Sequence, residues 1–302
     1  FRQLKELPNK PKVVLDAGNG TGGFIAYPIL KELDFDVIGL FIEPDGTFPN
    51  HHPDPTVEEN LKELKKTLKD NSFDIGIGFD GDADRIGVIL KNEETMYGDQ
   101  LLLLFAQHIL KEHKGATIIG EVKCSQVLYD KIEQAGGKAI MWKAGHSLIK
   151  AKMKEEKALL GGEMSGHIFF ADRYFGYDDA IYVSLRLLEI LAKERIDLQK
   201  WKNDLPKTFN TPEIRIDCPE DKKVLVTKEI EDYYIKNKEK YAITNIITID
   251  GIRFNTKNGW GLVRSSNTQP ALVLRFEANS PENLEKLKND TLNIVKKTIE
   301  SV

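Results

Sequence analysis

The sequence has 302 residues, and its 43 lysines and arginines against 47 aspartates and glutamates give a net charge of −4. This length predicts two or three domains with substantial cores. The nearly balanced charge argues against nucleic acid as the main partner, because nucleic-acid-binding surfaces are usually strongly basic.

The only cysteines, Cys124 and Cys218, lie far apart in the sequence and have no metal-ligand spacing. They indicate neither a disulfide framework nor a zinc site, and they favour a reducing, cytoplasmic location. No apolar run is long enough to cross a bilayer, so we expect no membrane partner.

The chain begins with the pattern of a βαβ unit: a strand at Val13–Asp16, a helix at Phe24–Leu33 and a strand at Val37–Ile42. The turn at 18–23 matches G-x-G-x-x-G, and Glu43 has about the spacing of a ribose-binding acid. A dinucleotide site is therefore one alternative. The signal is weak, because any tight strand-to-helix turn benefits from glycines.

A polar, proline-rich loop follows at 48–55 and contains His51 and His52. Neighbouring side chains diverge and no third ligand of matching type lies near, so a rigid surface loop is favoured over a metal site. Thr56 and Glu59 then have the spacing of a capping box for a helix at Val57–Lys69.

Three aspartates, Asp80, Asp82 and Asp84, occupy alternate positions in one short loop. The flanking residues 73–78 and 86–90 are apolar and glycine-spaced, which predicts two buried strands. Carboxylates this close repel one another unless a cation neutralises them. Oxygen ligands without histidine or cysteine favour Mg²⁺ over Zn²⁺, so the loop predicts a magnesium site.

This loop has two other interpretations. An EF-hand loop has glycine at its sixth position and glutamate at its twelfth, where this sequence has Arg85 and Lys91. A solvated acidic turn is the remaining alternative, although a turn between buried strands gains nothing from three like charges.

A second segment repeats the same order of elements. We expect helices at Gln100–Glu112 with Asp99 as its cap, from Ser125 to about Gly136, and at Asp178–Glu194. The expected strands are Thr117–Val122, Ala139–Trp142, Ala158–Leu160 and Ile168–Phe170. The repeat predicts two copies of one α/β fold, and residues 205–208 are interpreted as a linker.

Two polar loops of this second copy are candidates for binding. The segment Lys143–Ser147 opens a helix whose N-terminus favours an anion. The loop between the last two strands carries Glu163, Ser165 and His167, which suit sugar hydroxyls. It holds the same place in its copy as the aspartate loop does in the first.

The last segment has strands at Glu213–Ile216, Ile243–Ile249, Trp260–Val263 and Ala271–Phe276, a helix at Val224–Lys236, and a final helix capped by Ser280. Between the last two strands lie the five polar residues Arg264, Ser265, Ser266, Asn267 and Thr268. One guanidinium and several neutral donors in a tight loop favour phosphate binding. A polar hairpin turn is the alternative.

Together these loops resemble the α-D-phosphohexomutase family, in particular its bacterial phosphomannomutase/phosphoglucomutase type. The resemblance runs from Val13 to Phe276 and rests on the segments 16–20, 48–55, 80–85, 143–147, 162–167 and 259–268. It implies an α/β fold class: two similar three-layer α/β domains with mixed sheets, at 1–95 and 96–207, and a C-terminal α+β domain at 208–302.

The resemblance also implies a role for each candidate residue. Asp80, Asp82 and Asp84 would hold Mg²⁺, and Arg85 would contact the phosphoserine or the transferring phosphoryl group. His146 and His167 would line the cleft as candidates for proton transfer. The implied substrate-binding residues are Lys123, Gly145, Glu163, Met164, Ser165, Gly166, Arg264, Ser265, Ser266, Asn267 and Thr268. Met164 favours mannose and glucose substrates.

The implied reaction interconverts hexose 1-phosphate and 6-phosphate through a phosphoserine and a hexose 1,6-bisphosphate. The family's phosphoserine lies in a Ser-His-Asn-Pro context, and no serine here is followed by those residues. We therefore expect the N-terminal phosphoserine domain to be absent and this chain alone to be inactive, with the Mg²⁺ site open on one side. A non-catalytic sugar-phosphate binding module is the alternative.

Overall fold

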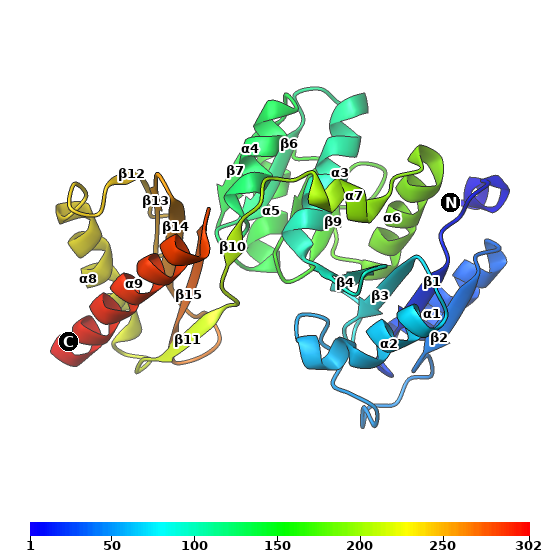
Figure 1. Ribbon diagram of the computed structural model, residues 1–302, viewed down its shortest axis with the longest axis horizontal. Coiled ribbons are helices and arrows are strands. Elements are labelled where there is room, and N and C mark those ends of the chain that lie inside the picture. Colours follow the sequence, from blue (N-terminus) through cyan, green and yellow to red (C-terminus); the bar gives the residue numbers. More distant parts are fainter. The chain divides into compact units, whose positions relative to one another are not determined.

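In a computed structural model that describes residues 1–302, the chain forms two compact units (Figure 1). Unit 1 comprises Phe1–Met141 and Gly145–Leu205, and unit 2 comprises Trp142–Ala144 and Pro206–Val302. None of the helices is both long enough and apolar enough to span a lipid bilayer.

The first sheet of unit 1 has the strand order β2-β1-β3-β4-β5. The central strand β1 runs parallel to β2 and β3, whereas β4 is antiparallel to β3 and to β5. The strands are β1 (Val13–Asp16), β2 (Val37–Leu40), β3 (Ile75–Phe79), β4 (Ile86–Leu90) and β5 (Thr95–Met96).

Helices cover both faces of this sheet. Val13 and Leu15 pack in one apolar cluster with residues of α1 (Gly22–Glu32), and Val14 packs in another with residues of α2 (Lys62–Asp70). Since successive strand residues point to opposite faces, the two helices lie on opposite sides. The result is a three-layer α/β arrangement.

The second sheet has the order β7-β6-β8-β9, with β6 parallel to β8 and β8 antiparallel to β9. This is the order β2-β1-β3-β4 repeated, which confirms the predicted mixed sheets. The strands are β6 (Thr117–Glu121), β7 (Lys138–Trp142), β8 (Leu160–Gly162) and β9 (Ile168–Phe170), and the helices are α3 (Gly98–Glu112), α4 (Gln126–Gln134), α5 (His146–Glu156), α6 (Ala180–Glu194) and α7 (Leu198–Asn203). One apolar cluster continues through both folds, from Phe79 to Phe170 and Leu187.

Unit 2 is an antiparallel sheet of order β10-β15-β14-β13-β12, with β11 also paired to β15. Both of its long helices share one apolar cluster with Val263, Leu272 and Leu274, so they cover the same face. The elements are β10 (Phe209–Asn210), β11 (Ile214–Asp217), α8 (Lys223–Lys236), β12 (Ile243–Ile247), β13 (Ile252–Thr256), β14 (Gly259–Ser265), β15 (Ala271–Ala278) and α9 (Pro281–Ser301).

Of the three predicted helix caps, two are wrong and one is confirmed. The Thr56 hydroxyl donates to Asp54 Oδ1 at 2.7 Å, and the 3₁₀ turn η2 (Glu58–Leu61) precedes α2. Asp99 lies inside the first turn of α3, where its Oδ2 accepts from the Ser125 N–H at 2.9 Å. Ser280 caps α9 as predicted, and Ser125, where a helix was expected to begin, is the cap of α4. A further 3₁₀ turn, η1 (Arg2–Glu6), begins the chain.

Candidate functional site

The acidic loop, residues 80–85, connects the antiparallel strands β3 and β4. Asp80 is only 3% exposed, and its Oδ1 accepts the backbone N–H groups of Asp84 and Arg85, each at 3.0 Å. Ala83 is buried with φ of 61°, a left-handed conformation that closes the turn. The loop is thus folded around the carboxylate of its own first residue.

This folding gathers the three carboxylates. Ligand oxygens of Asp80, Asp82 and Asp84 lie within 4.8 Å of one another. Burial, followed by the hydrogen bond with Asp80 and the nearby charge of Asp82, raises the pKa of Asp84 to about 7. Without a cation, the cluster therefore takes up a proton near neutral pH. A set of hard oxygen donors that resists full ionisation fits a divalent cation such as Mg²⁺.

Arg85 is held in place by two carboxylates. Its Nε donates to Asp80 Oδ2 at 2.7 Å, and its Nη1 donates to Asp54 Oδ1 at 3.1 Å. These bonds leave the Nη2 group available to a phosphoryl oxygen. Asp54 comes from the loop 48–55, which the sequence indicated only as a rigid surface loop.

The glycine-rich turn at 18–23 packs against the acidic loop. A Cβ on Gly20 would lie 2.6 Å from the carbonyl oxygen of Gly81, and the Thr21 N–H donates to the same oxygen at 2.9 Å. Close backbone packing therefore explains why position 20 is glycine, without a bound nucleotide.

The second polar loop, residues 163–167, connects β8 and β9. Glu163 is 5% exposed, and its Oε1 accepts the N–H of Gly145 at 2.5 Å, directly before α5. The N–H of Met164 donates to Glu121 Oε1 at 3.3 Å. Ser165 is half-buried beside them, with its hydroxyl unused by other residues of the chain. The loop is therefore fixed while Ser165 keeps its hydrogen-bonding capacity.

The acidic loop and the 163–167 loop are joined through their backbones. The Ile86 N–H donates to the carbonyl oxygen of Gly166 at 3.2 Å, and Arg85 and His167 form an antiparallel bridge. Gly166 has φ of 100°, and a Cβ there would lie 2.4 Å from the Ile86 oxygen. Only glycine permits this approach.

The junction places His167 between two acids. Its Nδ1 lies 3.5 Å from Asp84 Oδ1 and 3.3 Å from Asp178 Oδ2. Burial disfavours the charged ring, but the carboxylates of Asp178 and Asp84 outweigh burial and raise the pKa of His167. The ring of His146 stacks on that of His167 at 5.7 Å between centroids. Sequence reasoning missed Asp178, because an acid just before a helix is ordinarily interpreted as a cap.

Lys123 lies beside a buried pair of acids. Its Nζ is 3.7 Å from Glu121 Oε1, and Glu121 is completely buried. Burial raises the pKa of Glu121, Lys123 opposes this shift, and the charge of Glu163 adds to it. Lys123 therefore contributes positive charge next to Glu121, whose pKa also responds to the charge of Glu163.

The third polar loop lies in unit 2, between β14 and β15. Arg264 is 5% exposed; its Nε donates to Asp250 Oδ2 at 2.9 Å, while its Nη2 is buried without a hydrogen-bond partner. Lys223 Nζ holds the loop by donating to the Ser266 carbonyl oxygen at 2.7 Å. An unsatisfied buried guanidinium N–H is costly and fits an anionic ligand.

The remaining predicted residues of this loop divide into two groups. The Ser265 hydroxyl is bonded inward, 2.9 Å from Thr227 Oγ1 and 3.1 Å from the Lys223 carbonyl oxygen. Asn267 and Thr268 are exposed, and the Thr268 N–H donates to Ser266 Oγ at 3.3 Å. Asn267 and Thr268 can reach a ligand, whereas the Ser265 hydroxyl supports the loop.

Comparisons with known proteins identify three consecutive domains. Residues 2–94 match phosphoglucomutase/phosphomannomutase α/β/α domain II, residues 97–209 match α/β/α domain III, and residues 213–294 match the C-terminal domain of the same family.

Individual relatives agree with these matches. The chain is 48% identical over 292 residues to a phosphomannomutase/phosphoglucomutase of Pseudomonas putida and 46% identical over 299 residues to one of Pseudomonas aeruginosa. These alignments cover 96% and 98% of this chain but 62% and 64% of the relatives. The crystal structure of a phosphoglucomutase/phosphomannomutase family protein from Burkholderia thailandensis superposes with a TM-score of 0.89 at 42% identity, covering 98% of this chain and 63% of that one. The chain thus spans less than two thirds of these relatives.

Proposed function

The chain belongs to the phosphoglucomutase/phosphomannomutase family, and from this premise we propose that it is the metal-, sugar- and phosphate-binding part of a hexose phosphate mutase. The reaction would interconvert the 1- and 6-phosphates of mannose or glucose through a phosphoserine and a hexose 1,6-bisphosphate. The observation that carries the proposal is the backbone junction between the acidic loop and the 163–167 loop. It brings the three carboxylates of the acidic loop close to His167 and to the loop that carries Glu163, which supports the proposal.

Asp80, Asp82 and Asp84 would hold the Mg²⁺ ion, which supplies charge stabilisation for phosphoryl oxygens when bound. Arg85 would use its Nη2 group on the same phosphoryl group, because its other bonds to Asp80 and Asp54 fix the guanidinium. Because the Arg85 guanidinium is already held in position, it loses little conformational entropy when the substrate binds.

Glu163 and Ser165 would bind sugar hydroxyls, with Lys123, Gly145, Met164 and Gly166 shaping the same surface. His167 and His146 are the candidates to take the proton from the attacking hydroxyl and to return it to the leaving oxygen. Asp178, close to both rings, would orient them.

Arg264, Ser266, Asn267 and Thr268 would hold the phosphate that is not being transferred. The support is the buried Nη2 group of Arg264, which has no partner in the chain. A phosphate oxygen would satisfy it and would form a charge-assisted hydrogen bond.

The phosphoserine of the proposed reaction would lie outside these residues. No serine in the sequence is followed by His-Asn-Pro, and the relatives are longer than the matched region. We propose that residues 1–95, 96–207 and 208–302 are the second, third and fourth domains, and that an N-terminal domain supplies the phosphoserine.

A coupled assay of glucose 1-phosphate or mannose 1-phosphate conversion tests these proposals. We expect no turnover from the 302-residue chain with Mg²⁺, and turnover from the same chain joined to its phosphoserine domain. Normal turnover from the chain alone would contradict the placement of the phosphoserine. Binding of hexose phosphates without turnover in the complete protein would instead favour a non-catalytic sugar-phosphate binding module.

A further inference from the structure

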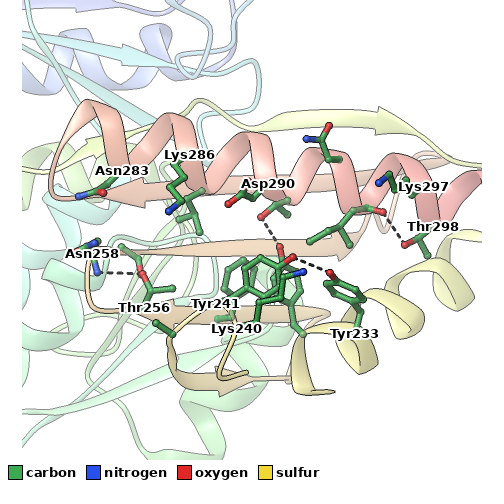
Figure 2. Close-up of a pocket in the computed structure, with 18 of the residues that line it drawn as sticks. Tyr233, Lys240, Tyr241, Thr256, Asn258, Asn283, Lys286, Asp290, Lys297 and Thr298 are labelled. Carbon is green, nitrogen blue, oxygen red and sulfur yellow. Dashed lines mark hydrogen bonds between the residues drawn. The ribbon is translucent and has the colours of Figure 1, made fainter. Parts of the chain in front are cut away.

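Unit 2 contains a cavity of about 890 Å³ between α9, the end of α8 and the turn that joins β13 to β14 (Figure 2). This volume is in the range of small-molecule sites in proteins. None of the residues 264–268 lines it. The cavity is therefore separate from the candidate phosphate loop, and the proposed mutase does not use it.

One wall of the cavity is aromatic and rigid. The rings of Tyr234 and Phe254 stack with centroids 4.1 Å apart, and Tyr241 meets Tyr234 edge to face at 5.4 Å. Hydrogen bonds fix the rings: Tyr234 to Thr291 at 2.7 Å, and the Tyr233 hydroxyl to that of Tyr241 at 2.9 Å. Tyr233 and Tyr241 are half-buried and offer ring surface to a planar ligand.

The charge of the lining is mostly positive. Lys240, Lys257, Lys286 and Lys297 line the cavity together with one acid, Asp290. None of the four lysines forms an ion pair within the chain. By contrast Lys288, which lies on α9 like Lys286 and Lys297 but outside the lining, pairs with Glu285 at 2.7 Å. Uncompensated lysines around a cavity attract an anion.

Lys240 also contacts the aromatic wall. Its Nζ lies 5.1 Å from the centroid of the Tyr241 ring. Hydrogen bonds with the hydroxyls of Tyr241 and Tyr233 raise the pKa of Lys240, so this ammonium stays charged across the physiological range. A positive charge and an aromatic ring are thus adjacent at one side of the cavity.

The other polar residues can recognise a nucleoside. Asn258, Asn283 and Asn293 line the cavity, and an amide side chain offers both a donor and an acceptor to the edge of a base. Figure 2 shows Lys286 and Asp290 projecting from α9 on the side that faces Tyr241. A carboxylate such as Asp290 accepts hydrogen bonds from ribose hydroxyls.

We propose that this cavity is a nucleotide-binding site, in which Tyr233 and Tyr241 stack on the base, Asp290 binds the ribose and the lysines hold the phosphates. A cationic ligand would meet four ammonium groups, and an apolar one would bury lysines and amides without partners. A hexose phosphate satisfies the lysines but lacks a planar aromatic face for the tyrosines. The site does not depend on the proposed mutase activity.

Calorimetric titration of the 302-residue chain, in buffer with a chelator to remove divalent cations, tests the proposal. ATP and UTP serve as nucleotide probes, with adenosine and inorganic triphosphate as partial probes. We expect saturable one-to-one binding of at least one nucleotide, and affinity about tenfold or more weaker for every partial probe, because each lacks the base or the phosphates. Absence of saturable nucleotide binding, or equal affinity for inorganic triphosphate, would overturn it.

Charge reversal locates the site. The double variant Lys286→Glu/Lys297→Glu should weaken nucleotide binding about tenfold or more, since attraction becomes repulsion at both positions. The control Lys236→Glu/Lys296→Glu makes the same charge change at exposed positions on α8 and α9 outside the lining, and it should change affinity less than about twofold. Equal weakening by both pairs would mean non-specific attraction and would overturn the site.

Variants of Tyr241 and Arg264 distinguish binding in this cavity from binding in the phosphate loop. Tyr241→Phe keeps the ring and should keep nucleotide binding, whereas Tyr241→Ala should weaken it. If Tyr241→Ala does not fold, the Lys286→Glu/Lys297→Glu variant tests the same site. Arg264→Lys should leave nucleotide binding unchanged. If Arg264→Lys loses nucleotide binding while Lys286→Glu/Lys297→Glu keeps it, the nucleotide binds in the phosphate loop, and the proposal is overturned. Failure of the mutase assay would leave these results untouched.

Discussion

The Ile86 N–H donates to the carbonyl oxygen of Gly166 at 3.2 Å, although 80 positions of sequence separate the two residues. This bond ties the acidic loop to the loop that carries Glu163 and His167. The relative position of these two loops therefore depends on close backbone contacts, this bond and the bridge between Arg85 and His167.

Gly166→Ala should destabilise unit 1 by about 3 kcal/mol or more, because the new Cβ would clash with the Ile86 oxygen at a φ of 100°. Gly136→Ala is the control: its φ is 80°, but no atom lies within 4 Å of the added Cβ, so it should cost only about 1 kcal/mol. Urea unfolding measures both. An equal loss of unfolding free energy in the two variants would show that the contact with Ile86 does not constrain the loop.

Asp82→Asn should reduce the affinity for Mg²⁺ by about tenfold or more, measured by calorimetry, because it removes a charged oxygen ligand. The metal-free variant should be as stable as the unaltered chain or more so, since repulsion with Asp80 and Asp84 falls. Asp70→Asn, an exposed acid at the end of α2, serves as the control. Unchanged Mg²⁺ binding in Asp82→Asn would count against the metal site.

Arg264→Lys should weaken the binding of glucose 1-phosphate about tenfold, because lysine cannot present the fork of donors that the buried Nη2 group completes. Its stability should change little, since an ammonium can still pair with Asp250. Arg215→Lys, an exposed arginine on β11, should leave phosphate binding unaltered. If both variants bind equally well, Arg264 does not hold phosphate.

His51 should make stability depend on pH. Its Nε2 lies 3.1 Å from Asp16 Oδ2, and the hydrogen bond with Asp16 raises the pKa of His51 above the ordinary 6.5, against the opposing effect of burial. A raised folded-state pKa means that the stabilisation is complete below pH 6.5 and is lost as the pH rises through the folded-state value.

The measurement compares the chain with His51→Gln by urea unfolding at pH 6 and pH 9. The free energy of unfolding of the unaltered chain should exceed that of His51→Gln by about 1 kcal/mol or more at pH 6. This difference should be smaller at pH 9. His52→Gln, at an exposed neighbouring position, should show no such trend. An advantage that grows with pH would refute the assignment of the charged pair to His51 and Asp16.

The sequence predicted the three hairpin loops well, because a strand, a turn and a returning strand are local in sequence. It missed partners that the fold brings in from other segments: Asp54 holds Arg85 across 31 positions, and Asp178, just before α6, approaches His167 from beyond β9. Thr56 was misinterpreted because Asp54 competes for its hydroxyl at short range. The cavity of unit 2 depends on the spacing between α9 and α8, which no local pattern encodes.

The bridge between Arg85 and His167 joins equivalent positions, since each residue directly precedes the last strand of its hairpin, β4 or β9. An antiparallel bridge between equivalent residues is what two identical subunits form across a two-fold axis. Unit 1 therefore has, within one polypeptide, the local pseudo-symmetry of a homodimer. Two copies of the same hairpin meet at that axis with different side chains, so a symmetric backbone presents an asymmetric surface.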